Sequence, residues 1–260
     1  MAIIDTHAHY DDDAYDPDRP AILAQITENG VSRIVNCASS YASIQTTLGL
    51  VRDYPTVYAA LGIHPSDGLD YTDEVEKELR VLLNQDKVVA VGEIGLDYYW
   101  SENPSRDWQK EILLRQFNLA RECNKPVILH VRDAYGDMME ILRANHDLRG
   151  VLHAFSGSPE IAKEAVSLGF YLGVGGVSTF KNAKRLPEVI AQTPIEFLLT
   201  ETDAPYLTPV PYRGKRNRSD YISYVITAIA QLKGLDREVT EQILYENALK
   251  FFGFRDGSNP

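Results

Sequence analysis

A pair of histidines near the N-terminus has the spacing of metal ligands. His7 and His9 form an H-x-H in the segment Asp5-Thr6-His7-Ala8-His9. In an extended strand, residues i and i+2 point to the same side, so both imidazoles can reach one point. Imidazole is a common ligand of zinc, and two convergent rings form half a site. The alternative for this pair alone is two solvated or capping histidines.

Four further residues with metal-binding side chains each occur at the end of a short apolar run. They are Glu93, His130, His153 and Asp203. A buried core histidine or an ordinary turn carboxylate explains any one of them, but not the repetition. Six such donors exceed what one tetrahedral ion uses, and they suit two divalent ions about 3.5–4 Å apart. We therefore predict a two-metal site with Glu93 as the bridging carboxylate. Its ligands are His7, His9, Glu93, His130, His153 and Asp203.

The elements that position these residues alternate along the whole chain. Short runs rich in β-branched residues predict eight strands, and amphipathic segments predict helices between them. The strands are expected at 3–4, 32–36, 57–62, 88–91, 126–130, 150–153, 170–173 and 197–201. Helices include 105–124, 159–168, 219–233 and 237–252, and long loops are expected at 97–105 and 203–218. This pattern predicts an α/β fold, a single (β/α)₈ TIM-type barrel over residues 1–260, with the metal site at the C-terminal face of the strands.

The composition excludes several classes of protein. The 260 residues include 26 Lys and Arg against 37 Asp and Glu, a formal charge of −11, which argues against a protein that coats duplex nucleic acid. Cys37 and Cys123 share no short spacing, so neither a disulfide framework nor a C-x-x-C site is expected. No signal peptide or membrane span is apparent. We expect a soluble cytoplasmic protein without a membrane partner, and a monomer.

Seven blocks of sequence carry most of these residues. They read DTHAHYD (5–11), GIHP (62–65), VGEIGLDYY (91–99), PVILHVRDA (126–134), HAFSGS (153–158), TETDAPYL (200–207) and PYRGKRN (211–217). In this order the chain resembles the TatD-family metal-dependent deoxyribonucleases, within the amidohydrolase-like metal hydrolases, from residue 5 to about residue 252. The H-x-H alone would also fit adenosine deaminases, urease-like enzymes and phosphotriesterases.

The resemblance implies an activity and a role for each matched residue. It implies a TIM-like barrel that hydrolyses phosphodiester bonds of nucleic acid, commonly as a 3′-to-5′ exonuclease on single strands, DNA more than RNA. One ion is implied to bind His7, His9 and Asp203, and the other His130 and His153, with Glu93 between them. Positions that contact the substrate or support the ligands are implied to be His64, Arg132 and Glu201.

The proposed chemistry follows from a two-metal site. Two divalent ions, whose identity among Mg²⁺, Mn²⁺ and Zn²⁺ is left open, would activate a water and polarise the phosphoryl oxygen, while Asp203 accepts the proton. Glu93 and Asp203 are thus the expected catalytic residues. Arg132 would hold a phosphate by two hydrogen bonds, unless it simply pairs with a carboxylate. His64 before Pro65 is equally well explained as a strand cap.

Two exposed segments are candidates for contact with a nucleic-acid strand. Tyr98, Tyr99 and Trp100 could stack bases, or could only cover the loop after the fourth strand. Four cations occur within six residues of the loop after the eighth strand, and we expect them to hold the phosphate backbone rather than merely to be solvated. They are Arg213, Lys215, Arg216 and Arg218.

One departure and two other functions stay open. The family often continues its RGKRN block with Glu-Pro, whereas this chain has Arg218-Ser219, which puts the anchoring of that loop in doubt. A hydrolase of small esters or amides, including aminoacyl esters, could use the same metal centre. A non-catalytic metal-binding scaffold is the third alternative, although it would be expected to lack ligand positions. The cations and aromatic residues favour a polyanionic substrate.

Overall fold

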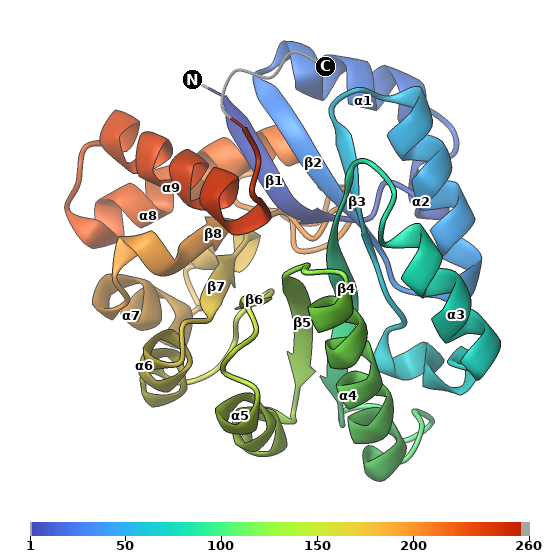
Figure 1. Ribbon diagram of the computed structural model, residues 1–260. Coiled ribbons are helices and arrows are strands. Elements are labelled where there is room, and N and C mark those ends of the chain that lie inside the picture. The colour runs from blue at the N-terminus through green and yellow to red at the C-terminus, as the bar shows by residue number, and fades with distance from the viewer. Residues whose placement is uncertain (1, 256–260) are drawn as a thin grey trace.

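Eight parallel strands form one sheet in strict chain order in the computed structural model, which describes residues 2–255 (Figure 1). The predicted barrel fold and all eight predicted strands are confirmed. The strands are β1 (Ile3–Ala8), β2 (Val31–Ala38), β3 (Val57–Leu61), β4 (Val88–Asp97), β5 (Val127–Arg132), β6 (Gly150–Leu152), β7 (Tyr171–Val174) and β8 (Leu198–Thr200).

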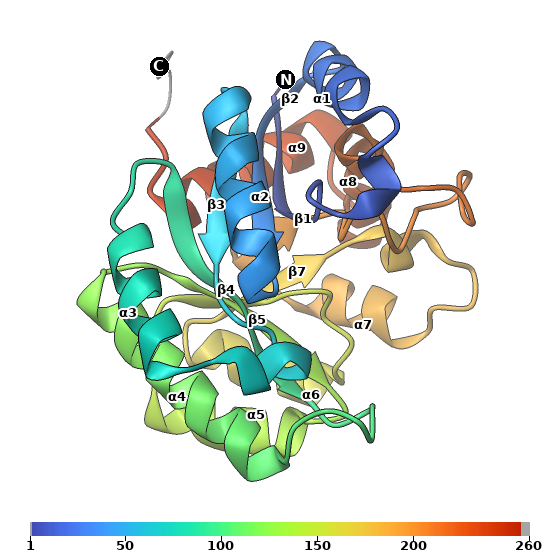
Figure 2. The ribbon, with the colours of Figure 1, turned by 90° about the vertical axis from the view of Figure 1, so that its right-hand side faces the viewer.

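Helices surround the strands, as a parallel sheet with two apolar faces requires. They are α1 (Arg19–Glu28), α2 (Tyr41–Asp53), α3 (Asp73–Leu82), α4 (Arg106–Glu122), α5 (Tyr135–Ala144), α6 (Pro159–Ser167), α7 (Arg185–Gln192), α8 (Ile222–Lys233) and α9 (Arg237–Phe252). Short 3₁₀ turns are η1 (Asp13–Tyr15), η2 (Pro65–Asp70), η3 (Gly176–Thr179), η4 (Ile195–Phe197) and η5 (Ser219–Tyr221). Figure 2 shows α2 lying against the outer face of β2 and β3. None of the described helices has the length and apolar character needed to cross a membrane.

The first and last strands meet and close the barrel. The Asp203 amide donates to the His7 carbonyl over 3.0 Å, and the His9 amide donates to the Ala204 carbonyl over 2.7 Å. A parallel bridge between Ala8 and Ala204 accompanies these bonds. The closure therefore brings the H-x-H segment beside the segment that follows β8.

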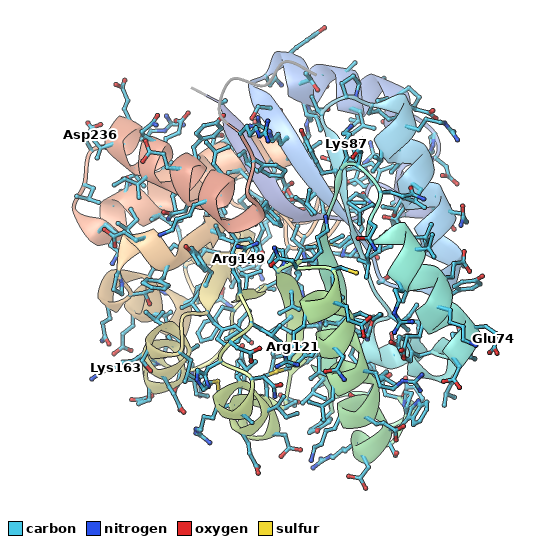
Figure 3. The ribbon with its side chains drawn as sticks, viewed as in Figure 1. Glu74, Lys87, Arg121, Arg149, Lys163 and Asp236 are labelled. Carbon is cyan, nitrogen blue, oxygen red and sulfur yellow. The ribbon has the colours of Figure 1, made fainter. Side chains whose placement is uncertain are left out.

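The alternation of side chains along the strands divides the core into two layers. One cluster of buried residues fills the barrel interior. It joins strand positions such as Ile4, Val35 and Ile128 with Phe251 of α9. The other strand positions pack with the surrounding helices in a larger cluster. Charged residues of the helix layer face outward, as Figure 3 shows for Glu74 and Lys163.

Strand β4 is longer than the sequence pattern indicated. We expected it to end at Val91, but it continues to Asp97. The glycines that interrupt the apolar run permit close packing of β4 against β5 rather than ending the strand. A Cβ at Gly95 would overlap the carbonyl of His130, and the φ of Gly95 is +154°. The strand therefore ends six residues beyond its predicted end, and the aromatic residues that follow it lie within the expected loop 97–105.

Candidate metal centre

All six predicted ligands converge at the C-terminal end of the barrel. Their positions along the strands differ from the predicted strand ends in two cases, because β4 runs on past Glu93 and β5 runs on past His130. His153 follows β6 directly, whereas Asp203 lies three residues after β8 in a left-handed conformation with φ +56°. That conformation is costly for a residue other than glycine and is typical of functional sites.

Irregularities in two strands accompany the ligands that they carry. Between Asp5 and Ala8, β1 advances three residues while β2 advances two, and His7 lies in this bulge. The same offset occurs in β4 between Val91 and Ile94, where Glu93 lies. A bulge redirects a side chain without ending the strand. His7 and His9 therefore converge because of the bulge in β1 as well as the predicted i, i+2 alternation.

Glu93 lies between two groups of donors. Its Oε1 is 2.8 Å from His130 Nδ1 and 2.8 Å from His153 Nε2. Its Oε2 is 3.5 Å from the Nε2 atoms of both His7 and His9. Asp203 completes the second group, with Oδ1 at 3.6 Å from His7 Nε2 and 3.4 Å from His9 Nε2. The two oxygens of one carboxylate thus face two different histidine pairs.

This arrangement fits metal cations better than a network of hydrogen bonds. His7 Nε2 and His9 Nε2 are only 3.0 Å apart, and two ring nitrogens at that distance need a proton or a cation between them. Glu93 belongs to two separate sets of donor atoms that lie within 4.8 Å of one another, one with His7 and His9, the other with His130 and His153. Imidazole and carboxylate donors suit Zn²⁺, Mn²⁺ and Mg²⁺ to different degrees.

Neighbouring groups orient two of the histidine rings. His9 Nδ1 donates to the Cys37 carbonyl over 2.8 Å, which leaves Nε2 to face the site. His130 Nε2 donates to Asp97 Oδ2 over 3.2 Å, which leaves Nδ1 to face Glu93. Such contacts fix the ring and raise its basicity as a ligand. Sequence reasoning missed Asp97, although its spacing of four residues from Glu93 places both on one face of an extended strand. It also missed Cys37, whose carbonyl accepts from His9 and whose Sγ lies 3.4 Å from His7 Nδ1.

Burial and charge set the protonation of these groups in the protein alone. Burial lowers the pKa of His7 to about 4. Burial also opposes the charge of His9, but its hydrogen bond with Asp203 and the charge of Glu93 outweigh it and raise the pKa to about 10. The same balance, with Asp97 and Glu93 as partners, raises the pKa of His130 to about 9. Burial alone would raise the pKa of Glu93, yet the surrounding histidines hold it well below its usual range.

Glu201 lies beneath the site rather than in it. Its Oε1 accepts a hydrogen bond from the Ala154 amide and is 3.9 Å from His153 Nδ1. Its Oε2 has no hydrogen-bond partner among the described residues, and burial raises the pKa of this carboxyl to about 8. Gly173 packs directly against the carboxyl group. Glu201 therefore holds the backbone of the segment after His153, whereas His153 Nδ1 has no hydrogen-bond partner among the described residues.

A cavity of about 620 Å³ is lined by five of the six candidate ligands, all except His7, and by His64 and Arg132. His64 Nε2 is 3.7 Å from Glu93 Oε1, and its Nδ1 accepts a hydrogen bond from the Ser66 amide at the start of η2. Both interpretations of His64 thus apply, because it caps this turn and also faces the site. Burial lowers its pKa to about 3, so the ring is neutral.

The three aromatic residues after β4 do not all lie on the same side of the loop. Tyr98 turns away from the cavity, and its hydroxyl donates to Asp137 over 2.8 Å. Tyr99 and Trp100 are 51% and 48% exposed, and the guanidinium carbon of Arg132 lies 3.9 Å and 5.4 Å from their ring centres. Arg132 therefore lies against aromatic rings rather than pairing with a carboxylate in the described part of the chain.

The predicted basic loop lies outside the wall of this cavity, as far as residues 2–255 show. Arg216 donates to Asp18 over 2.7 Å, and Arg213 lies 4.2 Å from the ring centre of Phe180. Lys215 lies 5.6 Å from the ring centre of Tyr212. The structure thus does not bring Arg213, Lys215 and Arg216 together with the six ligands.

The loop is anchored in spite of its departure from the family pattern. Asn217 donates from Nδ2 to the carbonyls of Thr202 and Tyr206, over 2.9 Å and 2.7 Å. Arg218 donates to Asp220 over 2.6 Å and to Gln25 over 2.9 Å. These bonds hold the loop against the segment that carries Asp203.

A (β/α)₈ barrel with this donor set at its mouth defines a metal-dependent hydrolase, and comparisons with known proteins specify the family. The family model described as "TatD related DNase" matches residues 4–253, so the chain belongs to the TatD family, and the resemblance is confirmed. It is 42% identical over 252 residues to the "Uncharacterized metal-dependent hydrolase YabD" of Bacillus subtilis (strain 168), covering 96% of this chain and 98% of that protein. It is 36% identical to "Uncharacterized metal-dependent hydrolase YcfH" of Escherichia coli (strain K12), over 97% and 96%. The crystal structure of the TatD homologue YjjV from Escherichia coli K12 superposes with a TM-score of 0.91 at 33% identity, covering 97% and 98%.

Proposed function

We propose that this hydrolase cleaves phosphodiester bonds of single-stranded DNA from the 3′ end, with two divalent ions at its metal centre. The observation that carries the proposal is the position of Glu93, whose two oxygens face separate histidine pairs. A pair of adjacent ions is the arrangement of many phosphatases and nucleases. The description of the matching family as a DNase supports the same substrate class.

The six ligands divide into two sets. His7, His9 and Asp203 would hold one ion, His130 and His153 the other, and Glu93 would contact both. Ions held in this way lower the pKa of a nearby water and polarise a phosphoryl oxygen.

Three side chains of the cavity would act on the substrate. The surrounding histidines keep the pKa of Asp203 below its usual range in spite of burial, so its carboxylate is ionised and can accept the proton of the attacking water. The Nδ1 atom of His64 accepts the Ser66 amide, so the neutral ring carries its proton on Nε2 and can donate it to a phosphate oxygen. Arg132, which lines the cavity, can hold a phosphate by two parallel hydrogen bonds.

The exposed rings of Tyr99 and Trp100 would stack bases of the entering strand beside Arg132. Stacking contributes about 1–3 kcal/mol per base and tolerates any sequence. Asp11 and Asp12 also line the cavity, and the chain carries a charge of −11, so the protein itself repels phosphates. We therefore expect weak binding that is sensitive to salt and depends on the metal ions.

Cleavage of a 5′-labelled single-stranded oligonucleotide tests the proposal. The reaction is followed with Mg²⁺, Mn²⁺ or Zn²⁺ and with chelator, beside a panel of small esters and amides. Glu93→Gln and His130→Ala should each reduce cleavage at least about a hundredfold, while His146→Ala is the control because this histidine is exposed at the end of α5. Metal analysis should give two ions per chain. Cleavage without metal, undiminished cleavage by both variants, or turnover of esters alone would refute the proposal.

A further inference from the structure

A second cavity adjoins the metal centre and is lined largely by apolar groups. It has a volume of about 350 Å³ and is lined by Phe155, Val177, Leu186 and Leu207, among others. The two cavities share part of their walls, including the ligand Asp203. A molecule whose reacting group lies at Asp203 can therefore place the adjoining group in the second cavity.

The wall of this cavity contains one buried polar group that lacks a partner. Glu201 is 1% exposed, and its Oε2 forms no hydrogen bond with any described residue. Two glycines, Gly173 and Gly175, line the cavity next to this carboxyl, and a Cβ at Gly173 would collide with it. A buried oxygen without a partner is costly unless a ligand or water supplies one.

The edge of the cavity is basic. Lys184 and Arg185 lie in its wall at the start of α7, and both are exposed. Neither forms an ion pair with a carboxylate within residues 2–255, unlike Arg216 and Arg218 of the predicted basic loop. Two exposed cations without a carboxylate partner in the described residues therefore lie at the edge of the second cavity, whereas the exposed Arg213 and Lys215 of the loop after β8 lie outside its wall.

We propose, on the basis of the proposed function, that the second cavity binds the base of the terminal nucleotide whose phosphate lies at the metal centre. The volume is within the range of small-molecule sites, roughly 300–1,000 Å³. The apolar wall with Phe155 suits a planar base, and Glu201 offers a hydrogen-bonding group for its polar edge. Lys184 and Arg185 complement the phosphates of a strand. An aliphatic acyl group would satisfy the apolar wall but neither Glu201 nor the two cations.

Binding and cleavage are tested with matched ligands that differ only in the base. The binding probes are thymidine 5′-monophosphate and deoxyribose 5-phosphate, titrated calorimetrically in the presence of Mn²⁺. The cleavage substrates are oligonucleotides that end in thymidine or in an abasic tetrahydrofuran nucleotide. We expect a preference of at least about fivefold for the ligand with a base, because a stacked base contributes about 1–3 kcal/mol.

Substitutions that fill the cavity should remove this preference. Ala183→Phe would fill the cavity with a ring on the segment before α7. Val177→Phe would fill it with a ring on η3, and it serves as the second variant if the first does not fold. Ala191→Phe is the matched control, because Ala191 is exposed on α7 and lies outside the cavity wall. The affinity for deoxyribose 5-phosphate should be the same in all folded variants.

The outcomes separate this proposal from the proposed function. A base preference in binding that the filling variants abolish supports the cavity assignment, even if no oligonucleotide is cleaved and the nuclease proposal fails. Cleavage of single-stranded DNA with equal rates for abasic and thymidine ends overturns the cavity assignment and leaves the nuclease proposal intact. Retention of the preference in both filling variants overturns it as well.

Discussion

Replacement of Gly173 by alanine should displace the Glu201 carboxyl and destabilise the segment that carries His153. Gly173 lies within β7, and an added Cβ would be 2.7 Å from Glu201 Cδ and 2.9 Å from Glu201 Oε1. Ordinary contact begins at 3.4 Å, so the carboxyl carbon must move by about 0.7 Å, the difference between 3.4 and 2.7. The substitution changes only one methyl group, which makes the cause of any effect easy to identify.

The cost of this displacement can be worked out from the surroundings of Glu201. The carboxyl is fully buried and its Oε1 accepts the Ala154 amide, so a displacement of the carboxyl disturbs that hydrogen bond. Overpacking of a well-packed site costs about 1–3 kcal/mol. Leaving a buried partner without its hydrogen bond costs about 1–3 kcal/mol more. We expect Gly173→Ala to lower the free energy of unfolding by about 2–6 kcal/mol.

Urea unfolding of the metal-free protein measures the effect. Gly136→Ala in α5 is the matched control, because its Cβ would meet nothing within 4 Å. Alanine is also a better helix former than glycine, so the control should gain up to about 1 kcal/mol. Shortening the carboxyl side chain in the double variant Gly173→Ala/Glu201→Asp should recover part of the loss, as a favourable coupling in a double-mutant cycle.

Two results would refute the reasoning about Glu201. The first is an unfolding free energy of Gly173→Ala within about 0.5 kcal/mol of the parent, the range of substitutions that touch nothing important. The second is strict additivity of the two substitutions, which would mean that the added methyl group and the carboxyl do not compete for the same space.

Three further predictions concern the metal centre and Asp5 of β1, the strand that carries His7. Asp97→Asn should lower metal affinity about 10–100-fold without loss of the fold, because Asp97 orients the His130 ring; unchanged affinity by calorimetry would contradict this. Metal binding near pH 7 should release about one proton each from His9 and His130, whose pKa values are about 10 and 9 without metal. Apparent affinity should therefore rise with pH, and titrations in two buffers of different ionisation enthalpy should differ. Burial raises the pKa of Asp5 to about 6 from its ordinary 3.8, so the folded protein binds this proton more tightly than the unfolded chain. Its contribution to stability should fall by ~3 kcal/mol as pH rises from about 4 to about 6, and Asp5→Asn should flatten that part of the metal-free unfolding profile.

Local chemistry was sufficient to predict the barrel and the six candidate ligands that converge at its mouth. The strands are apolar runs with β-branched residues, and their alternation with amphipathic helices permits few topologies other than a parallel barrel. Because parallel strands of a barrel end at one face, residues such as His153 and Asp203 at the ends of these runs had to approach one another. Their side-chain types then indicated metal ions before any distance was known.

Other features depend on contacts between residues far apart in the chain. The bulges that accompany His7 and Glu93 arise from the pairing of each strand with its neighbour, which a single strand does not encode. Arg216 appeared free in its loop, yet it pairs with Asp18 at a separation of 198 residues.

The second cavity is likewise visible only in three dimensions, because its walls come from the segments after β6, β7 and β8 and from the start of α7. Sequence alone thus determined which residues could do the chemistry and at which end of the barrel they would meet. Tertiary packing decided which charges remain accessible and where a substrate can lie, since both depend on which distant side chains pack against each other.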